Sequence, residues 1–358
     1  MRPTAIQKSL FEDSDYFSYK FPLPQYLGAK HILSSWIAQF IPTETKVILD
    51  AFSGSQSIAY LCKQLGYQVI TNDFLKFNSE IGRALIENKY IKLDLNDLNL
   101  LFSENLNPTE FNLFETLYTD VFFIREETKF LDSYRSNISL LGNKYKQALA
   151  VVIANRAMTR KITMGHFAHT QALNYASNPE RIKRNRSLIR PLKSLILDIA
   201  DDYNNAVFDN KKECIAYNEN VLELLPSLSN IDVVYFDPPY CNSHADYQSF
   251  YHLLETFTIY WKDKEFINRI KRYSPKKYSG FDTKKEVVKN FQILFEKSKN
   301  IPTWLISYNN RSYPDIDTLV SLIKPYRNVI IHEKTYLNSR GGKGSVAGSN
   351  EILLECKY

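Results

Sequence analysis

Residues 46–73 read KVILDAFSGSQSIAYLCKQLGYQVITND, and this stretch determines the fold class. The apolar run at 46–52 predicts a buried strand, and the small residues that follow it predict a tight turn. Residues 58–66 predict a helix that is closed by its final glycine. A second apolar run at 67–73 predicts another strand. Because two parallel strands need a crossover between them, this order indicates the opening of a parallel α/β sheet.

The remaining strand signals lie far along the chain. Apolar runs at 213–217, 231–236, 303–308, 329–332 and 351–355 each have the length of a strand. Between about 79 and 212 the sequence reads mainly as helices and loops. We therefore expect one α/β domain formed by residues 20–80 and 213–358, with a mostly helical domain at 81–212 inserted into its sheet.

Composition narrows the class of protein. The chain has 358 residues, of which 44% are hydrophobic, enough for a full core and against global disorder. A net charge of +6 is compatible with a polyanionic partner. The four scattered cysteines indicate neither a zinc site nor a disulfide framework. Without an apolar leader or a membrane-spanning run, we expect a cytoplasmic protein that binds no membrane.

Basic residues gather in the middle of the chain. Between Arg156 and Lys193 there are nine of them, and the only acid in that span is Glu180. A solvated helix face is the ordinary explanation of such a run. A phosphate-binding surface is the alternative, and the segment alone does not separate the two.

The tetrapeptide Asp237-Pro238-Pro239-Tyr240 follows directly on the predicted strand at 231–236. Ligands of open α/β sheets bind beyond the carboxyl ends of the strands. Two successive prolines fix two φ angles and remove two N–H donors, so the turn can aim a carboxylate, a carbonyl and an aromatic ring at one point. The tetrapeptide is therefore either a plain turn or the centre of an active site.

Three other segments decide between these two possibilities. Phe52-Ser53-Gly54-Ser55-Gln56 is similar to F-x-G-x-G, Tyr26-Leu27-Gly28-Ala29-Lys30 is a variant of W-x-G-x-K, and residues 247–256 fit Y-x-x-F-Y-H-x-x-E-T. Along the chain the order is the upstream segment, the glycine turn, a long insertion, D-P-P-Y and then the tyrosine-rich element. This order resembles that of the adenine-N6 methyltransferases of DNA whose recognition region precedes the catalytic motif. The resemblance covers about residues 25–258. It implies a Rossmann-like methyltransferase sheet that uses S-adenosylmethionine, with an inserted, mostly helical recognition domain.

The resemblance assigns roles to individual residues. Catalysis falls to Asp237, Pro238, Pro239 and Tyr240. The residues expected at the cofactor are Tyr26, Gly28, Lys30, Asp50, Phe52, Ser53, Gly54, Ser55, Asp73, Asn220, Val221 and Asp237. Those expected at DNA are Arg156, Arg160, Lys161, Arg181, Lys183, Arg184, Arg186, Tyr247, Phe250 and Tyr251. No metal is expected.

Physical chemistry supports several of these roles and leaves alternatives for others. Backbone N–H groups of the glycine turn suit the carboxylate end of the cofactor. Asp73 suits its ribose hydroxyls, or else caps a helix. Asn220 stands where the family usually has aspartate, and it either binds the cofactor's adenine or caps the helix that follows. Phe250 and Tyr251 either line a base pocket or pack in the core.

One departure from the family pattern concerns the cofactor. Gln56 occupies the place of the last glycine in F-x-G-x-G, and its side chain would either crowd the cofactor or turn away from it. We expect N6 of a flipped-out adenine in duplex DNA as the acceptor, in a monomeric enzyme paired with a cognate restriction endonuclease. The alternatives are an N4-cytosine DNA methyltransferase and an inactive, methyltransferase-like DNA-binding protein.

Overall fold

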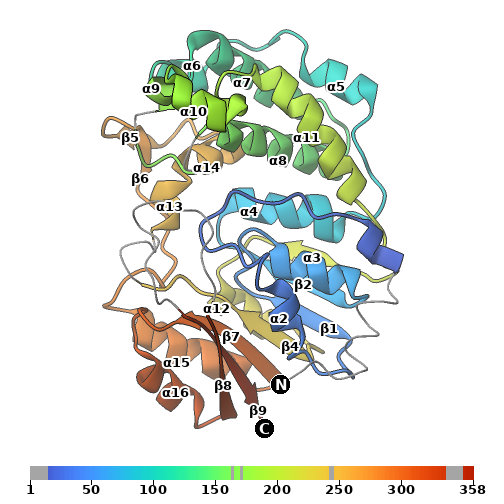
Figure 1. Ribbon diagram of the computed structural model, residues 1–358, viewed down its shortest axis with the longest axis vertical. Coiled ribbons are helices and arrows are strands. Elements are labelled where there is room, and N and C mark those ends of the chain that lie inside the picture. Colours follow the sequence, from blue (N-terminus) through green and yellow to red (C-terminus); the bar gives the residue numbers. More distant parts are fainter. Residues whose placement is uncertain (1–14, 163–164, 170–171, 242–245, 336–349) are drawn as a thin grey trace.

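A seven-stranded sheet forms the centre of the molecule (Figure 1). The computed structural model describes residues 15–162, 165–169, 172–241, 246–335 and 350–358. The strand order is β3-β2-β1-β4-β7-β9-β8. The strands are β1 (Val47–Asp50), β2 (Gln68–Asn72), β3 (Ile215–Tyr217), β4 (Val233–Phe236), β7 (Thr303–Asn309), β8 (Asn328–Thr335) and β9 (Asn350–Lys357). The first five strands in this order are parallel, and β9 runs antiparallel to both neighbours, which confirms the predicted Rossmann-like sheet.

Both faces of the sheet are buried. In β4, Val233 and Tyr235 belong to one apolar cluster, and Val234 and Phe236 belong to the other. The first face packs against α3 and α4, and the second against α12, α15 and α16 (Figure 1). Burial on both sides explains why the strands read as continuous apolar runs instead of alternating ones. The helices are α2 (Ser34–Ala38), α3 (Ser57–Gln64), α4 (Lys76–Ile81), α12 (Val221–Leu224), α15 (Val287–Ser298) and α16 (Ile316–Ile323). Of these, α2 packs on α3.

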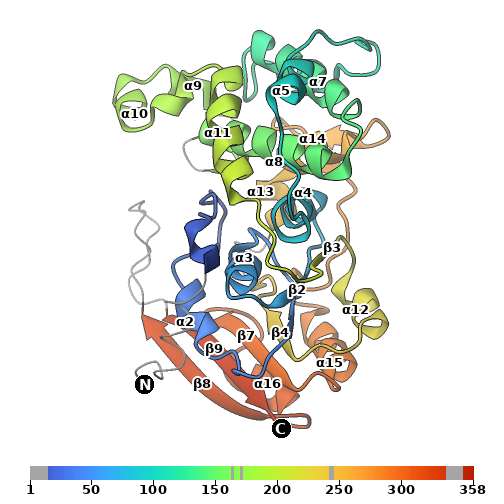
Figure 2. The ribbon, with the colours of Figure 1, turned by 90° about the vertical axis from the view of Figure 1, so that its right-hand side faces the viewer.

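A layer of helices covers α4 on the side away from the sheet (Figures 1 and 2). Its central helix is α8, which contacts α4, α7, α11 and α14. One apolar cluster runs from the sheet through α4 into this layer, and α14 belongs to it although it follows the tetrapeptide in sequence. The proposed domain boundaries at 81 and 212 stay a prediction. The helices are α5 (Leu95–Leu101), α6 (Leu113–Tyr118), α7 (Arg125–Ile138), α8 (Lys144–Arg160), α9 (Ala172–Ala176), α10 (Pro179–Arg184), α11 (Leu192–Ala206), α13 (Tyr247–Phe250) and α14 (His252–Ile259).

A small antiparallel hairpin was not expected from the sequence. It pairs β5 (Glu265–Ile267) with β6 (Arg272–Ser274) and lies beside α14. Each strand has three residues, too few for a period to be visible. The short helical turns are η1 (Asp15–Ser18), the π-helix η2 (Gly82–Glu87), η3 (Arg186–Leu188) and η4 (Leu225–Ser227). In the described parts of the chain, no helix has the length and apolarity to cross a membrane.

Candidate active site

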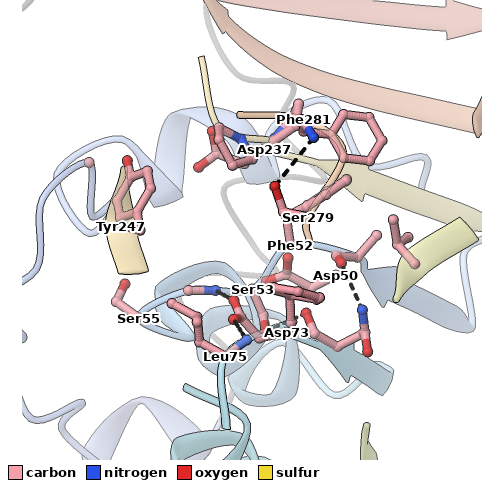
Figure 3. A pocket seen from close by; sticks show the side chains of 18 of the residues that line it. Asp50, Phe52, Ser53, Ser55, Asp73, Leu75, Asp237, Tyr247, Ser279 and Phe281 are labelled. Atoms are coloured by element: carbon pink, nitrogen blue, oxygen red, sulfur yellow. Dashed lines mark hydrogen bonds between the residues drawn. The ribbon is translucent and has the colours of Figure 1, made fainter. Parts of the chain in front are cut away.

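A pocket opens at the carboxyl ends of β1, β2, β3 and β4. In Figure 3, Asp237 lies across this pocket from Asp73, and Tyr247 faces the same space. Residues from the upstream segment, from the glycine turn and from the tetrapeptide therefore meet at one place. All twelve residues that the sequence assigned to the cofactor line it, as do Pro238, Pro239, Tyr240 and Tyr247.

Lys30 connects the upstream segment to the tetrapeptide. Its Nζ lies 3.1 Å from an Asp237 carboxylate oxygen and 3.3 Å from Glu351 Oε1. It also donates a hydrogen bond of 2.7 Å to the Tyr240 hydroxyl. That hydroxyl lies 2.9 Å from an Asp237 carboxylate oxygen and 3.2 Å from a Glu351 carboxylate oxygen, and it can donate its single proton to either. The four side chains form a closed network in which one ammonium serves two carboxylates.

Burial and the neighbouring charges together determine the pKa values of Lys30, Asp237 and Glu351. Burial by itself lowers the pKa of Lys30, but the charges of Asp237 and Glu351 outweigh it, and the pKa lies above its ordinary value. Burial raises the pKa of both carboxylates, while Lys30 opposes that rise. Lys30 is therefore charged at neutral pH, and its charge keeps the two buried acids ionisable.

Glu351 is a residue of the site that the sequence did not reveal. It is the second residue of β9 and is 2% exposed. Pairing of Asn309 with Glu351 in the ladder between β7 and β9 brings it to the carboxyl end of β7, next to β4. The signal in the sequence was a single acid at the start of an apolar run, which is common at strand ends.

Asp73 fixes the glycine turn from the neighbouring strand. Its carboxylate accepts hydrogen bonds of 2.8 Å from both Gly54 N and Leu75 N. Burial raises its pKa to about 6. The amides of Ser53 and Ala51 are also bonded within the protein, to Asn72 O and Tyr235 O. The turn thus uses most of its N–H groups to hold its own shape, which leaves fewer for the cofactor's carboxylate than the sequence suggested.

Gln56 turns away from the pocket. It has a φ of 67°, a left-handed conformation that favours glycine, which explains the glycine of the family pattern at this place. Its side chain is fully buried. The amide nitrogen donates to Ser53 Oγ at 2.6 Å and to Asn78 O at 3.2 Å, and the amide oxygen accepts from Thr71 Oγ1 at 2.6 Å. Gln56 is a structural residue beneath the turn, and it removes the main argument for the inactive alternative.

Replacing Gln56 should therefore lower stability without weakening cofactor affinity. Gln56→Ala leaves the Thr71 hydroxyl without its hydrogen-bond acceptor and keeps a Cβ at positive φ. The free energy of unfolding should therefore fall by about 1–3 kcal/mol. Gln56→Gly should lose about 1 kcal/mol less, because it relieves the backbone strain. Urea denaturation measures both, and titration of the cofactor gives the affinity. A large rise in the dissociation constant with unchanged stability would place Gln56 at the cofactor instead.

Asn220 combines the two roles that the sequence left open. Its Oδ1 accepts a hydrogen bond of 3.0 Å from Leu222 N, which caps α12, and the residue also lines the pocket beside Val221. The sequence did not single out Asn72, which ties the adjacent turns together. Its side-chain amide donates to Ala51 O and Glu219 O, both at 3.2 Å, and its oxygen accepts from Glu219 N.

Tyr26 and Tyr247 form one wall of the pocket, and Tyr251 stacks on Tyr26. Ring centroids of Tyr26 lie 5.6 Å from Tyr247 and 4.7 Å from Tyr251, with planes within 17° of parallel. Tyr247 faces the pocket. Tyr251 is 1% exposed and accepts a hydrogen bond of 2.7 Å from Leu27 N, and this burial favours the core-packing alternative for it. Phe250 is half-buried against His166 and does not line the pocket.

The rest of the tyrosine-rich element joins distant segments. His252 is 1% exposed, and its Nε2 lies 3.1 Å from Phe167 O. Glu255, also buried, accepts hydrogen bonds from the first two amides of α4, Lys76 N at 3.0 Å and Phe77 N at 2.9 Å. The element therefore positions the loop at 165–169 and the start of α4 next to the pocket.

The basic residues that the sequence assigned to DNA fall into two groups. On α8, Arg156 donates to Gln25 at 2.6 Å and Arg160 lies 3.6 Å from Asp202, and Lys161, just after this helix, pairs with Glu127. These side chains are engaged within the protein. The second group, on α10 and η3, is exposed to solvent and consists of Arg181, Lys183, Arg184 and Arg186.

Comparison with known proteins gives the family. Over residues 26–309 the chain matches the D12 class N6 adenine-specific DNA methyltransferases. It is 34% identical to the type II methyltransferase M2.HphI of Haemophilus parahaemolyticus, a match that covers 94% of this chain and 97% of that protein. It is 26% identical to the type II methyltransferase M.FokI of Planomicrobium okeanokoites, over 84% of this chain and 47% of that protein, so it spans about half of M.FokI. The chain belongs to the D12 class N6 adenine-specific DNA methyltransferases.

Proposed function

We propose that this protein transfers the methyl group of S-adenosylmethionine to N6 of an adenine flipped out of a specific duplex DNA sequence. The observation that carries the proposal is the Lys30 network, which holds the Asp237 carboxylate and the Tyr240 ring at the carboxyl end of β4. The tyrosine wall, with Tyr247 towards the pocket, lies beside that carboxylate.

The charge of the pocket suits a cationic cofactor. Among the described residues, five acidic ones and one basic one, Lys30, line it, so a ligand rich in phosphate is disfavoured there. Asp50 is 1% exposed, and its Oδ1 has no hydrogen-bond partner among the described residues. An unpartnered carboxylate oxygen at this place would accept from the ammonium group of the cofactor's methionine end. Asp73 and Asn220 retain acceptor capacity for the ribose hydroxyls and the adenine amino group.

The chain's residues would act on the base by positioning. The lone pair of an aromatic amino group is delocalised into the ring, which makes it a poor nucleophile. Asp237 and the carbonyl of Pro238 would accept hydrogen bonds from its two N–H groups and so favour a tetrahedral nitrogen. On methylation the nitrogen would release one of these protons to the Asp237 carboxylate, and the cofactor would leave as a neutral thioether. Tyr240 would stack on the base, a contact worth about 1–3 kcal/mol. The bound sulfonium supplies an electrophilic methyl group, so alignment of the two is the main catalytic contribution.

Sequence similarity supports a setting for the enzyme. Both relatives named above are type II methyltransferases. We infer that this protein is paired with a cognate restriction endonuclease and protects the DNA sequence that this endonuclease cuts. Duplex DNA would then be the macromolecular partner of the enzyme, which we propose to be a monomer.

A direct assay tests the proposed reaction. The protein is incubated with S-adenosylmethionine labelled in its methyl group and with duplex DNA of mixed sequence, and the digested nucleosides are separated. N6-methyladenine is expected. N4-methylcytosine would contradict the choice of base, and label in RNA alone would contradict the choice of nucleic acid. Absence of label from both would support an inactive binding protein.

The exposed group on α10 and η3 should contact DNA phosphates. Arg184→Gln with Arg186→Gln should weaken binding and reduce the slope of log K against log salt by about 1.8, because each phosphate contact adds roughly 0.9. Fluorescence anisotropy at several salt concentrations measures the slope. Arg160→Gln is the control from the group tied up within the protein. An unchanged slope in the double variant would mean that this segment is a solvated helix face that does not bind DNA.

A further inference from the structure

The hairpin β5–β6 carries a run of positive charge that the proposed site does not use. From residue 268 to 279 the chain has five basic residues and no acid. Two of these side chains are neutralised, since Lys276 pairs with Asp246 and Lys277 with Glu255. The other three have no ion pair with any described residue, and they are Arg269, Lys271 and Arg272.

The backbone conformation at Lys271 is energetically unfavourable for a lysine. Lys271 has a φ of 54°, a left-handed conformation that glycine or asparagine adopts more readily. Asn268, at the other end of the turn, also has positive φ, and its side chain accepts from Ile270 N at 3.2 Å. A lysine at such a position loses conformational energy, which a function for its charge would explain.

The hairpin is held firmly against the wall of the base pocket. Gln248, which lines the pocket, donates to Lys277 O at 2.7 Å and accepts from Lys277 N at 2.9 Å. The hydroxyl of Tyr273 in β6, a residue 2% exposed, donates to the same Gln248 oxygen at 3.2 Å. From the helical layer, Tyr118 donates to Lys271 O at 3.1 Å. The charges of the hairpin therefore have a fixed place relative to the pocket.

The hairpin and α10 lie on either side of the helical layer. In Figure 1 both lie on the left-hand side of the molecule, as does α13, whose residues reach the pocket. In Figure 2 the hairpin, in orange, lies at the edge opposite to α9 and α10. DNA that delivers a base to this pocket carries phosphates on both sides of that base. With basic residues on α10 alone, the duplex would be held on one side only.

We propose that Arg269, Lys271 and Arg272 form a second phosphate-binding element, which grips the DNA on the side of the flipped base opposite to α10. The inference rests on the proposed function, because it takes the pocket as the place of the target base. Phosphate contacts fix the position of a duplex without reading its sequence. The hairpin should therefore contribute equally to binding of target and non-target DNA.

Salt-dependent binding tests the hairpin. The variant combines Arg269→Gln with Lys271→Asn, since asparagine tolerates positive φ. The slope of log K against log salt should fall by about 1.8, so that between 50 and 200 mM salt the variant loses roughly tenfold less affinity than the wild type. Turnover at saturating DNA should be unchanged. The control is Lys46→Gln with Lys324→Gln, exposed residues just before β1 and after α16, at the opposite end of the sheet from the pocket.

The possible outcomes distinguish failure of the hairpin proposal from failure of the proposed function. A reduced slope in the hairpin variant and an unchanged slope in the control support the proposal. Equal slopes in wild type and hairpin variant, with normal methylation, would overturn it and leave the proposed function standing. Equal reductions in both variants would also overturn it, because they would reflect net charge and not contact. If the wild type itself methylates no DNA, the proposed function fails, and the slopes still report whether the hairpin binds phosphates.

Discussion

Asp237→Asn is expected to reduce methyl transfer by about 100-fold or more, while the protein still folds and binds its cofactor. Asparagine has nearly the same shape, but its NH₂ group would point a donor at an amino group that needs an acceptor. A reacting nitrogen displaced by about 1 Å can lose a factor of roughly 100. Single-turnover transfer to duplex DNA measures the loss.

Two measurements separate this effect from misfolding. Lys30 retains Glu351 as a partner in the variant, so thermal unfolding should change little compared with the loss in rate. Asp317→Asn, in the exposed first turn of α16, serves as the matched control and should keep full activity. Retention of more than half of the wild-type rate by Asp237→Asn would remove Asp237 from the reaction.

Lys30→Met is expected to have the largest effect on stability. It leaves Asp237 and Glu351 buried without their cation, and loss of one partner from a buried ion pair costs about 3–5 kcal/mol. Urea denaturation at pH 7.5 measures the difference. The two carboxylates would then have pKa values in the folded protein above those of the unfolded chain. The variant should therefore regain stability as the pH falls, while protons neutralise the acids.

A second substitution tests the origin of this loss. Glu351→Gln alone should be mild, because Lys30 keeps its contact with Asp237. Combined with Lys30→Met it should restore part of the stability, since one buried carboxylate remains in place of two. A double variant no more stable than Lys30→Met would mean that the loss comes from packing of the lysine side chain and not from its charge.

Local sequence predicted those parts of the site that are contiguous in the chain. The tetrapeptide follows β4 directly, and the glycine turn follows β1 directly, so a strand prediction placed both at one edge of the sheet. Gln56 shows the limit of such reasoning. The missing glycine was visible, but the direction of the side chain depends on Ser53, Thr71 and Asn78, which lie on three different segments.

Residues brought in by tertiary structure were not predicted. Glu351 reaches Lys30 only because β9 lies between β7 and β8, an order that no local pattern contains. The burial of Tyr251 depends on the upstream segment that lies across it. The short strands of the hairpin gave no period, and its basic residues were overlooked for that reason. Long-range packing thus decided which of the predicted aromatic and basic residues are available to a ligand.

The position of Glu351 also has a consequence for biosynthesis. Lys30 leaves the ribosome long before Glu351, and β9 must enter between β7 and β8, which are both made before it. Domains fold as their residues emerge, so most of the sheet and the helical layer can assemble on the nascent chain. The ammonium group of Lys30 meets its second carboxylate only after β9 has been made. A newly made molecule would thus complete its charge network later than it forms the strands on either side of β9.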